Sequence, residues 1–268
     1  INKGTIYDSE MLGNRLNFNP AGRDVTSLYM DDGYLFFNIQ PVEVNVNGDS
    51  IDIEMRIYEG EQATINKIIV NGNTKTSDHV ILRELRTLPG QKFSRSNLIR
   101  TQRELSQLGY FDPEQMGINP IPHPEDGTVD IEYNVTEKAN DQFTLSGGWG
   151  GFYGFVGTVG LVFNNFAASK LFKPNEYDPL PGGNGQRVAV NMQANGRTYQ
   201  SYNFSFTEPW LGGKKPNSLT FSLNHSIQKP FDPNNDSTFL KVNGATLYLG
   251  RRLQVPDDYF NLSNAISF

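Results

Sequence analysis

The chain has 268 residues, of which 37% are hydrophobic and 19% charged, with a net charge of -6. This acidic balance argues against a nucleic-acid partner, which needs clustered Lys and Arg to neutralise phosphates. No apolar run reaches the length of a helical membrane span, and the absence of cysteine leaves the redox compartment open. The mean hydropathy of -0.48 fits a soluble protein or a membrane β-barrel, in which every second strand residue faces water.

The first half of the chain contains an internal repeat, in which Leu28 to Glu59 is similar to Leu105 to Glu137. In the first copy, Ile6 to Leu16 fits a helix and Asp24 is placed to cap a second one. Phe36 to Val46 and Ser50 to Tyr58 fit a hairpin. This copy lacks an opening strand, which would leave an unpaired sheet edge, so we expect the chain to be cut from a longer protein.

The second copy begins with a strand at Thr64 to Val70 and a turn at Asn71-Gly72-Asn73. Thr76 or Ser77 is placed to cap a helix that Pro89-Gly90 stops. Its apolar positions are Ile81, Leu82, Leu85 and Leu88.

A second helix in this copy begins at Ser94 or Ser96 and ends at Gly109. Strands near Gln115 to Ile121 and Thr128 to Glu137 follow. Each copy therefore has the order strand-helix-helix-strand-strand, the first one without its opening strand.

From Asp141 onward, runs of about ten residues alternate in polarity, as membrane β-strands do. Asn195-Gly196 predicts a tight hairpin. A soluble sandwich gives the same alternation, but strand length, hairpin order and aromatics near the strand ends favour a membrane barrel. Those aromatics are Trp149, Tyr153, Trp210 and Tyr259. The predicted strands cover about 141–150, 155–163, 187–195, 201–207, 219–224, 238–253 and the residues from 259.

The repeat resembles the POTRA domain, the periplasmic module of outer-membrane insertases, through Gly109-Tyr110-Phe111 and the closing run Val129 to Glu137. The alternative for this repeat is a generic α+β spacer. Barrel strands directly after such a module are similar to the BamA family of insertases. The early barrel strands of that family resemble Asn164-Asn165-Phe166, Tyr199 to Phe206 and the motif Thr207, Glu208, Pro209 and Trp210.

The expected fold is thus α+β POTRA modules (β-α-α-β-β) followed by antiparallel transmembrane β-barrel strands, an all-β partial barrel. Residues 1–60 form a partial module, residues 61–138 a complete one, and residues 139–268 the first six to seven barrel strands. One departure from the family pattern is Phe166 to Gln186, which is far longer than a short periplasmic turn. It is expected to fold over the barrel base or to contact a partner.

The resemblance implies the core subunit of a β-barrel assembly machinery in the bacterial outer membrane, with its POTRA modules in the periplasm. In the family, the first and last strands pair poorly, so that the first strand can template an incoming strand through a lateral gate. Its glycines would make that strand pliable; alternatively, they form a turn with Tyr153 and Gly154. The matching positions here are Phe143, Thr144, Leu145, Ser146, Gly147, Gly148 and Trp149.

The implied partners are unfolded outer-membrane proteins, accessory (lipo)protein subunits, periplasmic chaperones and outer-membrane lipid. The POTRA modules would bind clients and accessory subunits through sheet edges, for which Asn38 to Val44 is one candidate. Pro41, Pro120 and Pro122 are alternatively prolines that protect those edges. The second candidate edge consists of Gln115, Met116, Gly117, Ile118 and Asn119.

Catalysis is not expected, because His79, His123 and His225 are scattered without metal-like spacing and no nucleophile motif occurs. No cofactor and no metal site are predicted. Two rival functions remain: a secretion pore of the same superfamily that exports one dedicated protein, and a passive porin or receptor barrel.

Overall fold

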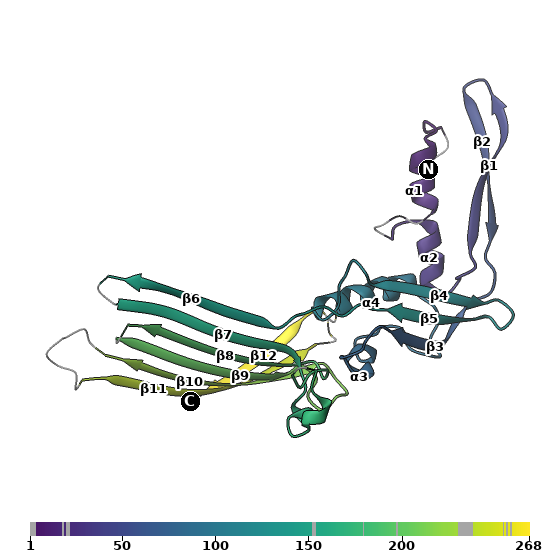
Figure 1. The fold of residues 1–268 in the computed structure, drawn as a ribbon. Helices are drawn as coiled ribbons and strands as arrows, with labels where there is room; N and C mark the ends of the chain where they lie inside the picture. Colours follow the sequence, from purple (N-terminus) through teal and green to yellow (C-terminus); the bar gives the residue numbers. More distant parts are fainter. Residues whose placement is uncertain are drawn as a thin grey trace. The chain divides into compact units, whose positions relative to one another are not determined.

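The computed structural model describes residues 4–17, 19, 22–151, 154–178, 180–196, 198–229, 238–253, 255, 257 and 259–268. The chain divides into two compact units (Figure 1). The first consists of Ile1–Asn73 and Glu84–Thr136, and the second of Thr74–Arg83 and Glu137–Phe268. A short segment from the middle of the second α+β repeat therefore belongs to the unit that contains the large sheet.

The amino-terminal part of the first unit is built from two helices and a hairpin. Helices α1 (Ser9–Leu16) and α2 (Val25–Asp31) lie along the hairpin formed by β1 (Asn38–Asn47) and β2 (Ser50–Tyr58), as Figure 1 shows. Asp24 caps α2 as predicted, because its carboxylate accepts a hydrogen bond of 2.9 Å from the backbone N–H of Ser27. The small core contains Leu12, Leu16, Phe37 and Ile39.

The second repeat supplies a three-stranded sheet with the order β3-β5-β4. β3 (Thr64–Asn71) runs parallel to β5 (Thr128–Asn134), and β4 (Gly117–His123) pairs with β5 in the antiparallel sense. Helix α4 (Arg95–Gln107) has the predicted cap, Ser94. The central strand carries the core, since Val129, Ile131 and Tyr133 are completely buried. The expected α+β module is thus confirmed.

Helix α3 (Asp78–Leu82) is shorter than predicted: the expectation that it continues to Leu88 is wrong. Beyond it, the backbone N–H of Arg86 donates to the Thr101 hydroxyl of α4 at 3.0 Å, so it is not available for a helical bond. The Arg86 guanidinium also makes two hydrogen bonds of 2.8 Å with the Glu104 carboxylate. Tertiary partners on α4 therefore replace the last turns of the predicted helix.

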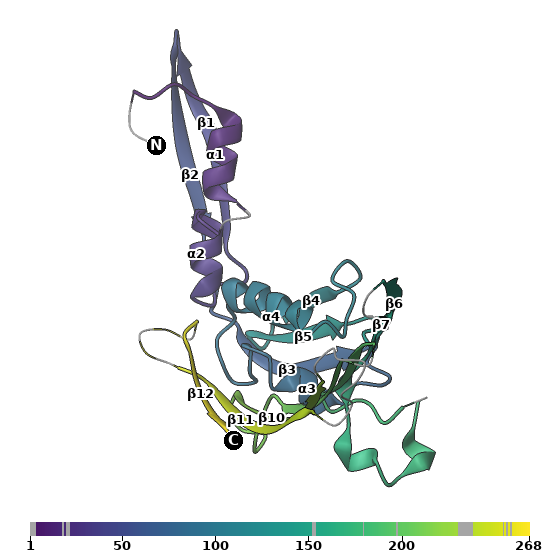
Figure 2. The same ribbon diagram turned by 90° about the vertical axis from the view of Figure 1, so that its left-hand side faces the viewer.

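The second unit contains one antiparallel sheet of seven strands in consecutive order, β6 to β12, among the described residues. Figure 2 shows that this sheet curls from β6 to β12 and does not close. None of the helices described is long and apolar enough to cross a membrane. The strands are β6 (Gln142–Gly150), β7 (Gly154–Phe166), β8 (Gln186–Asn195), β9 (Tyr199–Glu208), β10 (Asn217–Gln228), β11 (Leu240–Arg252) and β12 (Asn261–Ser267).

The strand register separates two chemically different faces, because side chains alternate with a period of two. We call one the apolar face; its members include Phe143, Leu145, Leu161, Val190, Phe204, Phe206, Phe221, Leu223, Leu247 and Ile266. We call the other the polar face; it carries Thr144, Ser146, Thr158, Asn191, Gln193, Ser201, Asn203, Ser205, Ser222 and Asn224. This is the alternation expected of barrel strands.

The long connection between β7 and β8 folds back onto the end of β7. The N–H of Ala167 donates to the carbonyl of Pro181 at 2.9 Å, and the N–H of Gly183 donates to that of Asn165 at 2.7 Å. Two short 3-10 turns, η1 (Ala168–Lys170) and η2 (Pro174–Glu176), shape the loop between these points. The segment is thus a closed loop at the strand ends.

Candidate functional site

The first strand of the large sheet lies at its edge. β6 pairs only with β7 among the described residues, so its other side presents unpaired backbone N–H and C=O groups. Three expected gate residues are strongly exposed on the apolar face: Phe143 (66%), Leu145 (69%) and Trp149 (78%). Thr144, Ser146 and Gly148 occupy the polar face. All seven predicted gate positions therefore share one edge strand.

Glycines weaken the packing of this strand near its hairpin end. Gly147 lies opposite Gly157 on β7, and the Phe155 ring lies across both, since a Cβ at Gly147 would meet it at 3.1 Å. At Gly148, nothing lies within 4 Å of the corresponding position. Gly147, Gly148 and Gly150 belong to the strand and Gly151 to the turn, whereas Tyr153 lies outside the described residues. A pliable strand remains the prediction for its function.

A carboxylate at the end of the second repeat holds the segment that precedes α3. Glu137 Oε2 accepts hydrogen bonds from the N–H of Thr74 at 3.1 Å, the Thr74 hydroxyl at 2.7 Å and the N–H of Lys75 at 2.8 Å. Its Oε1 accepts a fourth from the N–H of Thr76 at 2.6 Å. We call this group, formed by Glu137 and residues 74–76, the Glu137 clamp.

The electrostatics of the clamp favour the charged carboxylate. Burial raises the pKa of Glu137, but the hydrogen bonds from Thr76, Thr74 and Lys75 lower the pKa by more than burial raises it. The pKa of Glu137 is therefore below its ordinary value. Hydrogen bonds to the charged form have this effect because they stabilise the anion. The clamp is therefore fully formed at neutral pH.

Asn165 connects this segment to the β7–β8 loop. It has a left-handed backbone with φ of 57°, which Asn tolerates better than most residues. Its side-chain amide donates to the Thr76 hydroxyl at 2.7 Å, and its side-chain oxygen accepts from the N–H of Gly185 at 2.8 Å. The N–H of Ser77 also donates to the carbonyl of Gly183 at 2.9 Å. A continuous hydrogen-bonded path thus joins Glu137 to the base of the sheet.

Close backbone approach explains the glycines of that loop. A Cβ at Gly183 would collide with the Lys75 carbonyl, and one at Gly182 would press on the Lys75 side chain. The sequence drew attention to Asn165 and Glu137 only as parts of family-like motifs. Their partnership was missed, although the Gly182-Gly183-Asn184-Gly185 run signals a crowded backbone.

The motif at the end of β9 forms hydrogen bonds with the neighbouring strands β8 and β10 and within its own turn. Glu208 accepts from the side-chain amide of Gln186 at 2.7 Å and from the N–H of Trp210 at 3.1 Å. The Thr207 and Thr220 hydroxyls lie 2.9 Å apart. The Arg83 guanidinium lies over the Trp210 ring, 5.6 Å from its centroid. Pro209 follows the last strand residue, where a missing N–H costs no ladder bond.

The expected binding edge of the second repeat is only partly a strand edge. β4 is the outer strand of its sheet, but it begins at Gly117, so Gln115 and Met116 precede it, and Met116 is buried. Ile118 and Asn119 pair with β5. Pro120 and Pro122 share the parity of Ile118 and lack an N–H, which reduces the donors at the open side. Among the described residues of the first repeat, β1 pairs only with β2.

No candidate centre for catalysis or metal binding is evident in the described part of the chain. There, no three His, Cys, Asp or Glu side chains are grouped so that they could hold a metal ion. His123 contacts Asp130 at 3.1 Å and His225 contacts Asn243 at 2.6 Å. Burial and Arg83 lower the pKa of His79 despite the carboxylates of Glu208 and Asp78. The three histidines therefore have separate structural partners.

Comparison with known families matches both parts of the chain. The POTRA family, described as a surface antigen variable number repeat, matches residues 63–138, and the Omp85 superfamily domain matches residues 182–268. The outer membrane protein assembly factor BamA of Neisseria meningitidis serogroup B is 29% identical over 229 residues, which cover 84% of this chain and 26% of that protein. The putative outer membrane protein assembly factor of Treponema pallidum is 29% identical over 219 residues, 79% of this chain and 24% of that protein.

The chain thus spans about a quarter of the length of these curated relatives. The crystal structure of BamA from Haemophilus ducreyi lacking POTRA domains 1-3 has a TM-score of 0.73 with this chain at 20% identity. The match covers 99% of this chain and 45% of that one, and it shows a shared fold.

Proposed function

Because this chain belongs to the BamA/Omp85 family, with a POTRA module and part of an Omp85 barrel sheet, we propose that it works as part of an outer-membrane assembly factor. Such a protein resides in the outer membrane with its POTRA modules in the periplasm. The family matches also confirm the expectation that the chain is not an enzyme. Its proposed task is the folding and insertion of other β-barrel proteins.

The unpaired edge of β6 supports a templating mechanism. Backbone N–H and C=O groups without partners are costly in lipid, so an open strand edge favours any strand that completes its hydrogen bonds. An incoming strand of a client can pair with β6 by β-augmentation. The open space at Gly148 and the glycine pair Gly147–Gly157 would let β6 bend to accept it. The lateral seam would lie beside this strand.

The POTRA modules would capture clients and accessory subunits before insertion. The outer side of β1 is the better edge for strand addition, because β1 contains one proline, Pro41, whereas β4 contains two at alternate positions. Unfolded outer-membrane proteins, accessory lipoprotein subunits and periplasmic chaperones are the proposed partners. Backbone pairing would tolerate their varied sequences, since it reads strand geometry rather than side chains.

A photo-crosslinking experiment tests the templating step. A photoreactive amino acid replaces Leu145 on β6 or Leu223 on β10, both exposed on the apolar face, in the full-length protein. Crosslinks to a client during assembly are expected at Leu145 only, because β10 is paired on both sides. Equal yields at the two positions would contradict templating by β6.

Depletion of the full-length protein tests the broader function. Other outer-membrane β-barrels should then accumulate unfolded in the periplasm. Their normal assembly after depletion would exclude an assembly factor and favour a passive porin or receptor barrel.

A further inference from the structure

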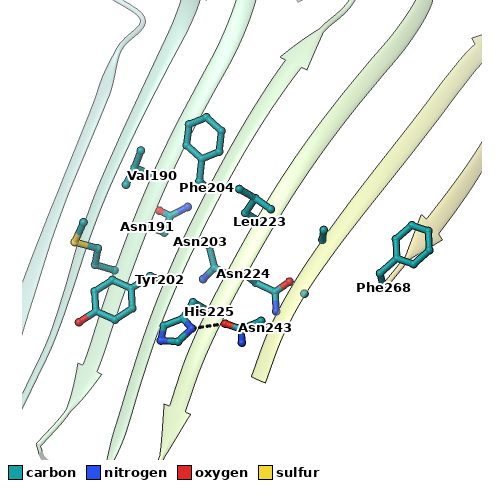
Figure 3. Close-up of a pocket in the computed structure, with 13 residues that line it drawn as sticks. Val190, Asn191, Tyr202, Asn203, Phe204, Leu223, Asn224, His225, Asn243 and Phe268 are labelled. Atoms are coloured by element: carbon teal, nitrogen blue, oxygen red, sulfur yellow. Dashed lines mark hydrogen bonds between the residues drawn. The ribbon is translucent and has the colours of Figure 1, made fainter. Parts of the chain in front are cut away.

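The apolar face carries a shallow hollow of about 600 Å³ across β8 to β12 (Figure 3). Its floor is a row of register partners, in which Val190 faces Phe204, Phe204 faces Leu223, and Leu223 faces Ala245. Ala245, which has the smallest side chain of this row, lines the hollow. The floor of the hollow is therefore apolar, and the hollow opens away from the apolar face of the sheet.

The next row toward the β8–β9 and β10–β11 hairpins is polar on three strands. Tyr202, His225 and Asn243 are register partners there. His225 Nδ1 donates a hydrogen bond of 2.6 Å to the side-chain oxygen of Asn243 (Figure 3). The Asn243 amide NH2 group is thus turned away from this bond and remains a donor. The Tyr202 ring lies beside His225 with a centroid separation of 6.1 Å.

A positive charge follows one row further. Lys241 is the register partner of Ile227 on the same face, and its ammonium lies 4.8 Å from the centroid of the Phe239 ring. In these rows of register partners, the described parts of β8, β10 and β11 place no Asp or Glu on the apolar face. The rim therefore offers donors and a cation, a combination suited to an anion with several acceptor oxygens.

Polar side chains near the ends of lipid-facing strands reach the membrane interface, where water and lipid headgroups supply their partners. The polar side chains of the rim border the apolar floor toward the β8–β9 and β10–β11 hairpins. These hairpins join the strand ends opposite to the end at which β6 begins, directly after the POTRA module. We propose that this hollow binds a phosphorylated acyl lipid of the outer leaflet. Its phosphate contacts Lys241 and Asn243, and an acyl chain lies over Phe204, Leu223 and Ala245.

The test is lipid binding to the full-length protein in detergent, measured by native mass spectrometry. Dioleoyl phosphatidic acid is compared with dioleoyl phosphatidylcholine, which has the same acyl chains. We expect about tenfold preference for phosphatidic acid, the effect of one charge-assisted contact. Lys241→Gln should abolish this preference. Lys214→Gln, an exposed lysine of the β9–β10 connection with the same charge change, should retain it.

Filling the floor gives an independent readout. Ala245→Leu and Ala245→Phe should reduce retention of both lipids, and the heat-modifiable gel mobility of the barrel identifies which variants are folded. The proposal is overturned if the unmodified protein shows no headgroup preference, if both lysine variants behave alike, or if a folded Ala245 variant binds as the unmodified protein does. Client assembly is expected to continue in Lys241→Gln, so this result is separable from the proposed function.

Discussion

Glu137 accepts a hydrogen bond of 2.6 Å from the backbone N–H of Thr76, and Thr76 in turn accepts one of 2.7 Å from the Asn165 side chain. Two short motifs far apart in the sequence are thereby tied together within the unit that contains the large sheet. The Glu137 carboxylate accepts hydrogen bonds from the backbone N–H groups of residues 74–76, which precede α3. The Asn165 side chain accepts one from the backbone N–H of Gly185 in the β7–β8 loop.

Glu137→Gln should loosen the segment before α3. The amide keeps the size of the side chain but removes the charge and one acceptor, so at least one backbone N–H of residues 74–76 loses its partner. Allowing for the partial exposure of the clamp, we expect a local loss of about 1–2 kcal/mol. Hydrogen–deuterium exchange of the peptide 73–83 should be about tenfold faster. Glu125→Gln, at an exposed acid of the β4–β5 turn, should leave it unchanged.

Substitutions at Asn165 should separate hydrogen bonding from backbone strain. Asn165→Gly removes the bonds to Thr76 and Gly185 but accepts the left-handed φ of 57°. Asn165→Ala removes the same bonds and adds about 1 kcal/mol of strain. The midpoint of heat-induced unfolding of the full-length barrel should therefore fall in the order unmodified protein, Gly variant, Ala variant. Equal midpoints for the two variants would show that the backbone relaxes.

The α+β module should lose stability in acid through Glu104. Burial raises the pKa of this carboxyl group, but the hydrogen bonds and charges of Arg86 and Arg100 lower it more, so its net pKa lies below 4.5. A lowered folded pKa contributes stability that is present above the unfolded value and is lost as pH falls through the folded value. We expect the loss below about pH 4.5, the ordinary value for this group.

Glu104→Gln should lower the stability of this module at pH 7 by about 2 kcal/mol and flatten its dependence on acid. Urea unfolding can be followed by a pH-insensitive dye on Gln107→Cys, at the exposed end of α4, because the chain has no other cysteine. Glu114→Gln, at an exposed acid, is the matched control. A steep acid dependence that persists in Glu104→Gln would assign it to other carboxylates.

Two neighbouring glycines of β6 should respond in opposite ways. Gly148→Val adds a strand-favouring side chain where nothing lies within 4 Å, so it should strengthen pairing with β7, by about 0.5–1 kcal/mol. Gly147→Val would press on the Phe155 ring and should weaken the same pairing. Amide exchange in β6 measures this directly. If β6 must bend to template clients, Gly148→Val should also slow client assembly into vesicles.

The repeats and strands were accessible from the sequence because they depend on local periodicity. Asp24 and Ser94 cap the predicted helices, and all seven predicted barrel strands occur at the expected positions. The length of α3 could not be predicted from the sequence, because Arg86 forms hydrogen bonds with Thr101 and Glu104 on α4. These partners lie more than one helical turn further along the chain, so local periodicity does not reveal them. The gate and binding-edge roles, and the domain boundaries, stay predictions.

By itself, the sequence determined the alternation of apolar and polar residues, and with it the two faces of the large sheet. A period of two assigns each side chain to a face without reference to any distant residue. Only the tertiary structure decided that Glu137, Thr76 and Asn165 meet, and that Ala245 lines one hollow with Tyr202, His225 and Asn243. These contacts join separate segments, and their geometry depends on register and loop closure, which local patterns do not specify.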